Sequence, residues 1–361
     1  GEPDEAFAAA KATALTERYA AHLGDAVRLR LRADVRLGTA LSGGLDSSSI
    51  VSLVNAQLRA LGRDEQQETF SSVYRGSADP AVRQADESAH VRRVVEALGV
   101  RSHCIEPQAA AVPSAHEHLI WALDTPPAGT LMSSWHTFAE VARQGVVVTL
   151  DGQGADEQLA GYSRYVRNAL VHAPLATLPS EVRALSRLEG FGSAIGVGVA
   201  GQLLRRVAGR STLAALARRL RMGADPSRTL DEALVQDFHT HLQNLLHYGD
   251  KTSMAWSVES RMPFMDVKLV EFLATVPPAY KIHDGWTKWL ARQAMAPHLP
   301  AEVAWRRDKL GWAVPEAPWF GSGGPLAARL QKVLSGSDFV KSVAGSAPVS
   351  YTHLRAHETH H

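Results

Sequence analysis

The 361-residue sequence has little that would place it in an oxidising compartment or a membrane. Its single cysteine, Cys104, excludes an intrachain disulfide and any metal site built from several cysteines. No apolar run approaches the roughly 20 residues that cross a bilayer, and the first residues lack a basic stretch followed by an apolar core. We therefore expect a cytoplasmic protein without a membrane partner.

The sequence also lacks an excess of charge of either sign. Its 38 basic and 37 acidic residues give a formal net charge of +1, which provides no long-range field that would recruit nucleic acid. An apolar content of 45% and a charged content of 21% are typical of a globular protein with one large or two smaller domains. No nucleic-acid partner is expected.

The order of elements along the chain predicts an α/β fold. Strand-like segments at 34–41, 69–74, 102–106 and 146–150 alternate with helix-like segments at 47–61, 86–98, 115–123 and 133–144. This alternation predicts a doubly wound, mostly parallel sheet. From residue 174 to about 237 the pattern is helical without obvious strands, and residues 190–201 are glycine-rich, which predicts a flexible interruption. A helical region packed against the sheet is expected to reach about residue 320.

Four segments follow from these patterns. Residues 1–30 are predicted to form an N-terminal helix that once linked to a further domain, and residues 31–320 to form the main domain. Residues 321–347 are expected to be a C-terminal helix or loop. Residues 348–361 concentrate histidine abruptly and are interpreted as a non-native or disordered tail rather than a metal-binding tract.

A glycine-rich loop follows the first predicted strand. It runs Ser42-Gly43-Gly44-Leu45-Asp46-Ser47-Ser48 and leads into a helix. The glycines let backbone amides approach a phosphate, the serines add hydroxyl donors, and the helix directs its positive N-terminal end at the anion. Because no Gly-Lys-Ser/Thr ends the loop, it is not a Walker loop. We predict that it binds pyrophosphate, with Asp46 holding Mg²⁺.

A second loop, Asp151-Gly152-Gln153-Gly154-Ala155-Asp156-Glu157, directly follows the strand 146–150. Two loops at the ends of neighbouring strands would face each other at a topological switch point of the sheet. Asp46 and Asp156 are therefore predicted to hold one magnesium–phosphate cluster. Downstream, Lys288 and Lys309 are the cations expected to neutralise charge on the phosphates.

Taken together, these residues resemble the synthetase domain of the glutamine-dependent asparagine synthetase family. The resemblance covers about 31–320 and rests on the two loops, on Asp86-Glu87, on Gly161-Tyr162, on the segment Glu259-Ser260-Arg261-Met262-Pro263-Phe264-Met265-Asp266, and on Lys309. It implies a sheet of the pyrophosphate-loop, adenine nucleotide α-hydrolase-like type with a helical C-terminal region. It also implies that ATP and Mg²⁺ are the cofactors.

The implied reaction starts when the aspartate side chain attacks the α-phosphate of ATP to give β-aspartyl-AMP. Ammonia then displaces AMP and asparagine forms. Carried over by position, the residues expected to bind ATP and pyrophosphate are Ala40, Ser42, Gly43, Gly44, Asp46, Ser47, Ser72, Asp151, Gly152 and Lys288. Lys309, Asp156 and Gln153 occupy the catalytic positions, and the candidate substrate contacts are Glu157, Asp250, Glu259 and Arg261.

Two departures from the family bear on the second half-reaction. Where the family often has Ser-Gly-Glu-Gly, this chain has Asp151-Gly152-Gln153-Gly154, so an amide that cannot accept a proton replaces the glutamate. The glutaminase domain of the family is absent from the sequence, so free ammonia or another amine is the expected nucleophile. Whether the protein forms a homodimer is left open.

Three alternatives differ in chemistry. A β-lactam or lasso-peptide macrolactam synthetase would join a different acid and amine, and Gln153 favours that alternative. Transfer of sulfur onto an adenylated carbon is disfavoured by the single cysteine, and modification of tRNA is disfavoured by the near-neutral charge. A non-catalytic nucleotide-binding protein is disfavoured because Asp46, Asp156 and Lys309 are all present.

Overall fold

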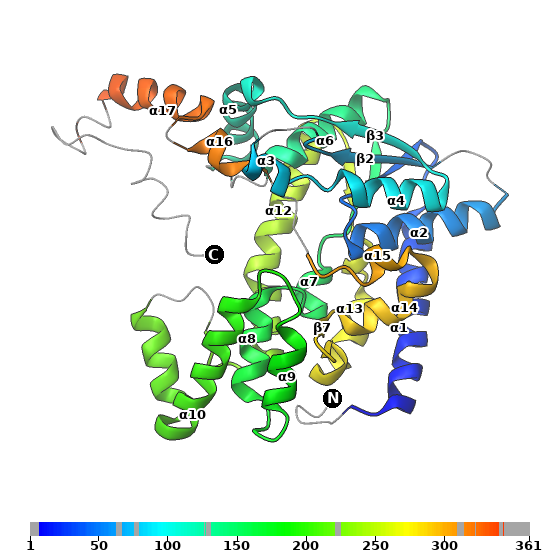
Figure 1. Ribbon diagram of the computed structural model, residues 1–361. Coiled ribbons are helices and arrows are strands. Elements are labelled where there is room, and N and C mark those ends of the chain that lie inside the picture. Colours follow the sequence, from blue (N-terminus) through cyan, green and yellow to red (C-terminus); the bar gives the residue numbers. More distant parts are fainter. Residues whose placement is uncertain are drawn as a thin grey trace.

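A computed structural model describes residues 7–62, 67–75, 79–125, 127, 131–220, 225–308, 314–321, 323–338 and 342. An α/β half and a helical half make up the chain (Figure 1). Helix α1 (Ala9–Arg30) precedes the sheet and packs its apolar side chains into the largest core cluster. The predicted N-terminal helix is thus present. None of the helices in these ranges is both long enough and apolar enough to cross a bilayer.

The central sheet has five parallel strands in the order β3-β2-β1-β4-β5. They are β1 (Leu37–Ala40), β2 (Glu68–Ser72), β3 (Arg101–Ile105), β4 (Val148–Leu150) and β5 (Glu259–Arg261). In register, Thr39 of β1 lies opposite Thr69 of β2 and Leu150 of β4. The chain leaves β1 toward β2 and β3 and later returns to the other side of β1, so β1 and β4 flank the switch point.

Helices cover both faces of the sheet, as the doubly wound prediction requires. Helices α2 (Leu45–Ala60) and α4 (Ser88–Leu98) share a core cluster with Leu41, which follows β1. Helix α6 (Leu131–Arg143) packs Phe138 and Val141 against Phe70 of β2 on the opposite face. Between β2 and α6 the chain also forms α3 (Pro80–Gln84), η1 (Ala109–Ala111) and α5 (Val112–Leu123).

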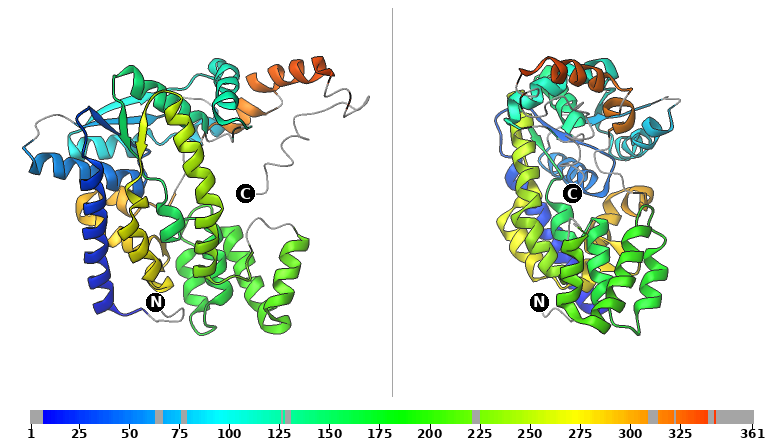
Figure 2. Two further views of the ribbon diagram at one scale, coloured as in Figure 1. Left: turned by 180° about the vertical axis from the view of Figure 1, so that it is seen from behind. Right: turned by 90° about the vertical axis from the view of Figure 1, so that its left-hand side faces the viewer.

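The helical half follows β4. It comprises α7 (Ala155–Leu159), α8 (Ser163–His172), α9 (Leu178–Leu185), α10 (Gly192–Arg219), α11 (Leu230–His239) and α12 (His241–Met254). After β5 come η2 (Pro263–Met265), α13 (Val267–Thr275), η3 (Pro278–Tyr280), the hairpin β6 (Ile282–His283) and β7 (Trp286–Thr287), α14 (Trp289–Met295), η4 (Ala296–His298), α15 (Ala301–Ala304), α16 (Glu316–Phe320) and α17 (Pro325–Gly336). Figure 2 shows from behind that α1 and α12 run from the sheet into this half.

Two sequence expectations differ from the structure. The glycine-rich stretch 190–201 is mostly helix, because α10 begins at Gly192 and bends only at Gly209, whose φ is 84°. A Cβ at Gly198 would lie 2.9 Å from Leu170 Cβ, so the small residue lets α10 approach α8 closely. The fifth strand, β5, was not expected, because three residues without apolar alternation carry no strand pattern.

Helix α17 lies within the segment 321–347, of which the structure describes 321, 323–338 and 342. The tail 348–361 lies outside the described residues.

Candidate active site

The pyrophosphate loop connects the end of β1 to the start of α2. The Ser47 hydroxyl accepts a hydrogen bond from the Ser42 amide at 3.2 Å and lies 3.0 Å from the Ser42 hydroxyl. Gly43 has a φ of 75°, and a Cβ there would lie 2.8 Å from the His90 side chain. Gly44 caps α2 in an extended conformation without a side-chain cap, so the first amides of the helix stay available to an anion.

The second loop packs directly on the first. Gly152 follows β4, and a Cβ at this position would lie 3.0 Å from the Ser47 amide nitrogen and 3.3 Å from the Asp46 carbonyl carbon. A side chain here would push the two loops apart by a few tenths of an ångström, so glycine suits this contact. The predicted meeting of the two loops at the switch point between β1 and β4 is therefore confirmed.

Lys288 joins the two predicted metal ligands. Its Nζ lies 2.6 Å from Asp156 Oδ1 and also contacts Asp46 Oδ2, while the lysine side chain is only 2% exposed. Burial lowers the pKa of the Lys288 ammonium, but the Asp156 and Asp46 carboxylates outweigh burial and raise it above its ordinary value. The lysine therefore stays charged, and the cluster carries one positive and two negative groups.

Gly161 makes room for this cluster. It follows α7, and a Cβ there would overlap both Asp156 Oδ1 and Lys288 Cε. Lys288 itself precedes α14 as its N-cap with a φ of 53°, and its amide donates to the Leu159 carbonyl. The backbone of the lysine is thus tied to α7, the helix that carries Asp156.

The pair of aspartates fits a magnesium ion. Asp46 Oδ1 is buried and has no hydrogen-bond partner among the described residues, which leaves a hard oxygen donor available. The described residues hold no group of three or more His, Cys, Asp or Glu side chains arranged for a metal. Magnesium commonly uses one or two carboxylates and completes its shell with phosphate and water oxygens, so two aspartates are sufficient protein ligands.

Asp151 is a buried carboxyl group beside the second loop. Its Oδ2 accepts a hydrogen bond from the Ser260 hydroxyl at 2.8 Å, and its amide donates to the Arg261 carbonyl. Burial raises the pKa of Asp151 to about 6, although the bond from Ser260 acts in the opposite direction. The side chain thus links the loop to β5.

The other predicted nucleotide contacts lie at neighbouring strand ends. Ala40 ends β1 and is buried, and Ser72 ends β2. The Ser72 hydroxyl donates to the Ser133 carbonyl at 3.1 Å and lies 2.9 Å from the Thr137 hydroxyl. Because α6 engages this hydroxyl, a contact of Ser72 with a nucleoside would fall to its backbone, and that contact stays a prediction.

Gln153 and Glu157 flank Asp156 in different ways. Gln153 is half-buried in the turn before α7, whereas Glu157 is buried and accepts a hydrogen bond from the Tyr162 hydroxyl at 2.8 Å. Burial, followed by the neighbouring Asp156 charge, raises the pKa of Glu157. Glu157 therefore connects the second loop to α8, and a role in substrate binding stays a prediction.

The basic segment after α15 is anchored close to the pyrophosphate loop. Arg306 Nη1 donates to Glu87 Oε1 at 2.7 Å, and both side chains are almost fully buried. Asp308 accepts from Arg306 Nε at 3.0 Å and lies 3.7 Å from His90, which contacts Gly43. Lys309 follows immediately but lies outside the described residues, so its catalytic role stays a prediction.

Three of the four candidate substrate residues lie away from Lys288. Asp250, Glu259 and Arg261 line a separate cavity of about 660 Å³ beside the end of α1. Arg261 pairs with Glu259 and donates to the carbonyls of Arg30 and Arg32, which holds the end of α1 against β5. Successive strand residues face opposite sides, so Ser260 points to Asp151 while its neighbours point away.

Two further residues near the cluster were not among the predicted site residues. Tyr19 of α1 is fully buried, and burial together with the charge of Asp46 raises its pKa well above the ordinary value. Arg292 is buried behind Lys288, and burial lowers its pKa to about 10 despite the nearby Asp46 charge. Tyr19 sits in an ordinary apolar helix stripe, so no sequence signal marks it.

Similarity to known proteins agrees with this geometry. Residues 18–360 match the asparagine synthase family. A protein of Mycobacterium tuberculosis named putative asparagine synthetase (glutamine-hydrolyzing) is 30% identical over 85% of this chain and 49% of its own length. Asparagine synthetase (glutamine-hydrolyzing) 1 of Bacillus subtilis is 28% identical over 82% of this chain and 49% of its own length.

A relative with a different name is similar to the same extent. Amidase chry2 of Gibberella zeae is 27% identical over 89% of this chain and 55% of its own length. The chain therefore spans about half the length of the curated relatives that it matches. Because the family match covers residues 18–360, the chain belongs to the asparagine synthase family.

Proposed function

We propose that this chain is the ATP-dependent synthetase part of an amide-forming ligase that adenylates the side-chain carboxylate of aspartate. Ammonia would then give asparagine, AMP and pyrophosphate. Family membership supports an ATP-dependent amide-forming ligase. The observation that carries the proposal is the convergence of Asp46 and Asp156 on buried Lys288, beside an open helix N-terminus.

Each part of this cluster suits one requirement of adenylation. The amides of the pyrophosphate loop and of α2 would bind the β- and γ-phosphates, which leave as pyrophosphate. Asp46 and Asp156 would hold Mg²⁺, whose charge offsets that of the phosphates. Lys288, already positioned by both aspartates, would stabilise charge that develops as the acid attacks the α-phosphate.

Gln153 bears on the identity of the amine. Gln153 lies in the turn between β4 and α7, where the family often has a glutamate, and an amide cannot accept the proton released by an attacking amine. This residue favours a second candidate, in which the same adenylating site joins a different acid and amine, as in β-lactam or macrolactam synthetases. A cytoplasmic location is part of the proposal for either candidate.

ATP–pyrophosphate exchange tests the adenylation step directly. The full chain would be assayed with Mg²⁺, with L-aspartate and then with other carboxylic acids. Asp46→Asn is the test variant because it keeps the shape but removes the charge. Asp124→Asn is the matched control, since Asp124 is exposed and its left-handed backbone (φ 56°) suits asparagine.

Aspartate-dependent exchange that persists in Asp124→Asn and falls at least about 100-fold in Asp46→Asn would support the proposal. Exchange with another acid alone would favour the lactam-forming candidate. Exchange that Asp46→Asn leaves unchanged would refute the assigned site.

A further inference from the structure

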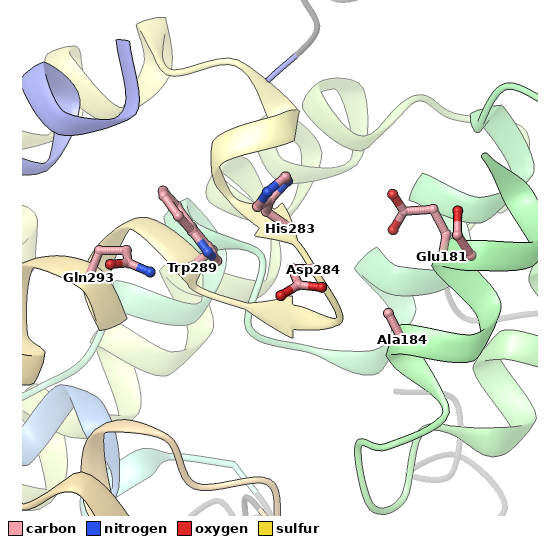
Figure 3. Close-up of a pocket in the computed structure, with 7 residues that line it drawn as sticks. Glu181, Ala184, His283, Asp284, Trp289 and Gln293 are labelled. Carbon is pink, nitrogen blue, oxygen red and sulfur yellow. The ribbon is translucent and has the colours of Figure 1, made fainter. Parts of the chain in front are cut away.

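A cavity of about 430 Å³ opens between α9, the β6–β7 hairpin and the start of α14, apart from the Lys288 cluster. Figure 3 shows Glu181 and Ala184 on α9 across the cavity from His283, Asp284 and Trp289. The volume falls in the range of small-ligand sites and would hold a group the size of an amino-acid side chain.

The walls of the cavity are held in place on both sides. Asp284 and Gly285 form the hairpin turn with φ angles of 46° and 72°, as a two-residue turn of this kind requires. A Cβ on Gly285 would lie within 2.5 Å of the Ala184 carbonyl carbon, so the turn rests directly on α9. On the other side, Phe7 stacks on His283 with ring centroids 3.6 Å apart and meets Trp289 edge-on at 5.2 Å.

The charge of the cavity is negative and not balanced within it. Neither Glu181 nor Asp284 makes a hydrogen bond or ion pair through its carboxylate to another residue that the structure describes. Burial, followed by the nearby Asp284 charge, raises the pKa of Glu181. Burial lowers the pKa of His283, so this imidazole is neutral at pH 7 and offsets neither carboxylate.

One cation described on this side is already engaged elsewhere. The Asp284 charge acts on the Arg307 guanidinium, but this guanidinium stacks on the Trp286 ring, 3.7 Å from the ring centroid. An aromatic wall next to two carboxylates is the chemistry that recognises an organic cation, since the ring face attracts positive charge and the carboxylates accept its N–H donors.

We propose that this cavity binds an alkylguanidinium or alkylammonium group between the Glu181 and Asp284 carboxylates and against the Trp289 indole. A guanidinium suits the site better than an ammonium, because its flat face stacks on a ring while its edge reaches two acceptors. The cation could come from a free small molecule or from a side chain of a peptide. The proposal does not depend on the assigned adenylation site.

Calorimetric titration of the full chain at low salt tests the proposal. The probes are agmatine, as a free cation, and N-acetyl-arginine N-methylamide, as an arginine within a peptide. The citrulline counterpart of the second probe has nearly the same shape without the charge. We expect the citrulline compound to bind at least about tenfold more weakly than the arginine compound.

Two nearly isosteric variants locate the binding. Glu181→Gln keeps the helix, and Asp284→Asn suits the left-handed turn position, so both should fold. Each should weaken guanidinium binding about three- to tenfold, and both together should weaken it further. Glu271→Gln, at an exposed position of α13, is the matched control and should leave binding unchanged.

The outcomes separate this inference from the proposed function. Binding of agmatine alone would assign a free small molecule, and binding of the peptide-like probe would assign a side chain. Binding should persist in Asp46→Asn, so that loss of exchange and loss of cation binding are independent. Equal affinity for the citrulline compound, insensitivity to both substitutions, preference for Ca²⁺ over guanidinium, or no binding at 10 mM of the arginine probe would overturn the proposal.

Discussion

Lys288 Nζ lies 2.6 Å from Asp156 Oδ1 and also contacts Asp46, a residue 242 positions away in the sequence. One buried lysine thus holds together the two loops that follow β1 and β4. Because each loop alone would present an unpaired carboxylate, the lysine stabilises the site as well as equipping it for chemistry.

Replacing this lysine should cost stability that magnesium can partly restore. Lys288→Met leaves two close carboxylates without their cation, and we expect the free energy of unfolding to fall by about 3–5 kcal/mol. Urea denaturation with and without Mg²⁺ measures the free energy of unfolding. A divalent ion bound to the same carboxylate oxygens should restore part of the lost stability. Lys268→Met, at an exposed site on α13, is the control. An unchanged stability, or no effect of Mg²⁺ specific to Lys288→Met, would contradict the prediction.

Gly161 should tolerate no side chain. In Gly161→Ala the new methyl group would displace Asp156 or Lys288, so pyrophosphate exchange should fall at least about tenfold and stability should drop by about 1–3 kcal/mol. Gly196→Ala is the matched control, since nothing lies within 4 Å of that position inside α10. This control should be stabilised by about 0.5–1 kcal/mol. Thermal unfolding measures the stability and the exchange assay measures the activity of both variants. Equal stability and equal exchange of the two variants would disprove the prediction.

Asp151 should make stability fall as pH rises. Its pKa in the folded protein is about 6, above the ordinary value of 3.8, so the folded state binds a proton more tightly than the unfolded state. The stability that Asp151 contributes through this proton is present below pH 4 and is lost as pH rises to 6. Asp151→Asn, which can still accept from Ser260, should therefore be more stable than the native chain by about 1–3 kcal/mol at pH 7, with a smaller gain at pH 5. Denaturation of both proteins at pH 5 and at pH 7 tests this prediction. A gain in stability of Asp151→Asn that is the same at both pH values would exclude it.

The Arg306–Glu87 pair should be strongly coupled. Arg306→Met strands the buried Glu87 carboxylate, with an expected loss of about 3–5 kcal/mol, whereas Glu87→Gln/Arg306→Met should recover much of it. A double-mutant cycle by urea unfolding gives the coupling energy. Losses that simply add would show that the pair does not anchor the segment before Lys309.

The part of the site that depends on local chemistry could be predicted from sequence. Each of the two loops, 42–48 and 151–157, has its glycines and acidic residues directly after a strand-like segment. Their place at strand ends therefore followed from the alternation of strand-like and helix-like segments in the sequence. Contacts between distant segments could not be predicted in this way. Lys288 was expected to contact phosphate, and only the fold shows that it bridges Asp46 and Asp156.

Strand direction explains why Glu259 and Arg261 were difficult to place. Their segment was recognised, but β5 has three residues and no apolar alternation, so neither the strand nor the side that each residue faces was apparent. The same limit applied to residues 190–201, where close packing on α8 makes a glycine-rich stretch helical.

By itself, the sequence determined the α/β alternation, the two ligand-binding loops and the family resemblance, because these depend on residue types at short spacings. Only the tertiary structure decided that Lys288 and Gly161 complete the cluster, that Arg261 braces α1, and that α9 and the hairpin line an acidic cavity. Those contacts join residues far apart in the chain, and they form only when the sheet order and the helix packing bring the segments together.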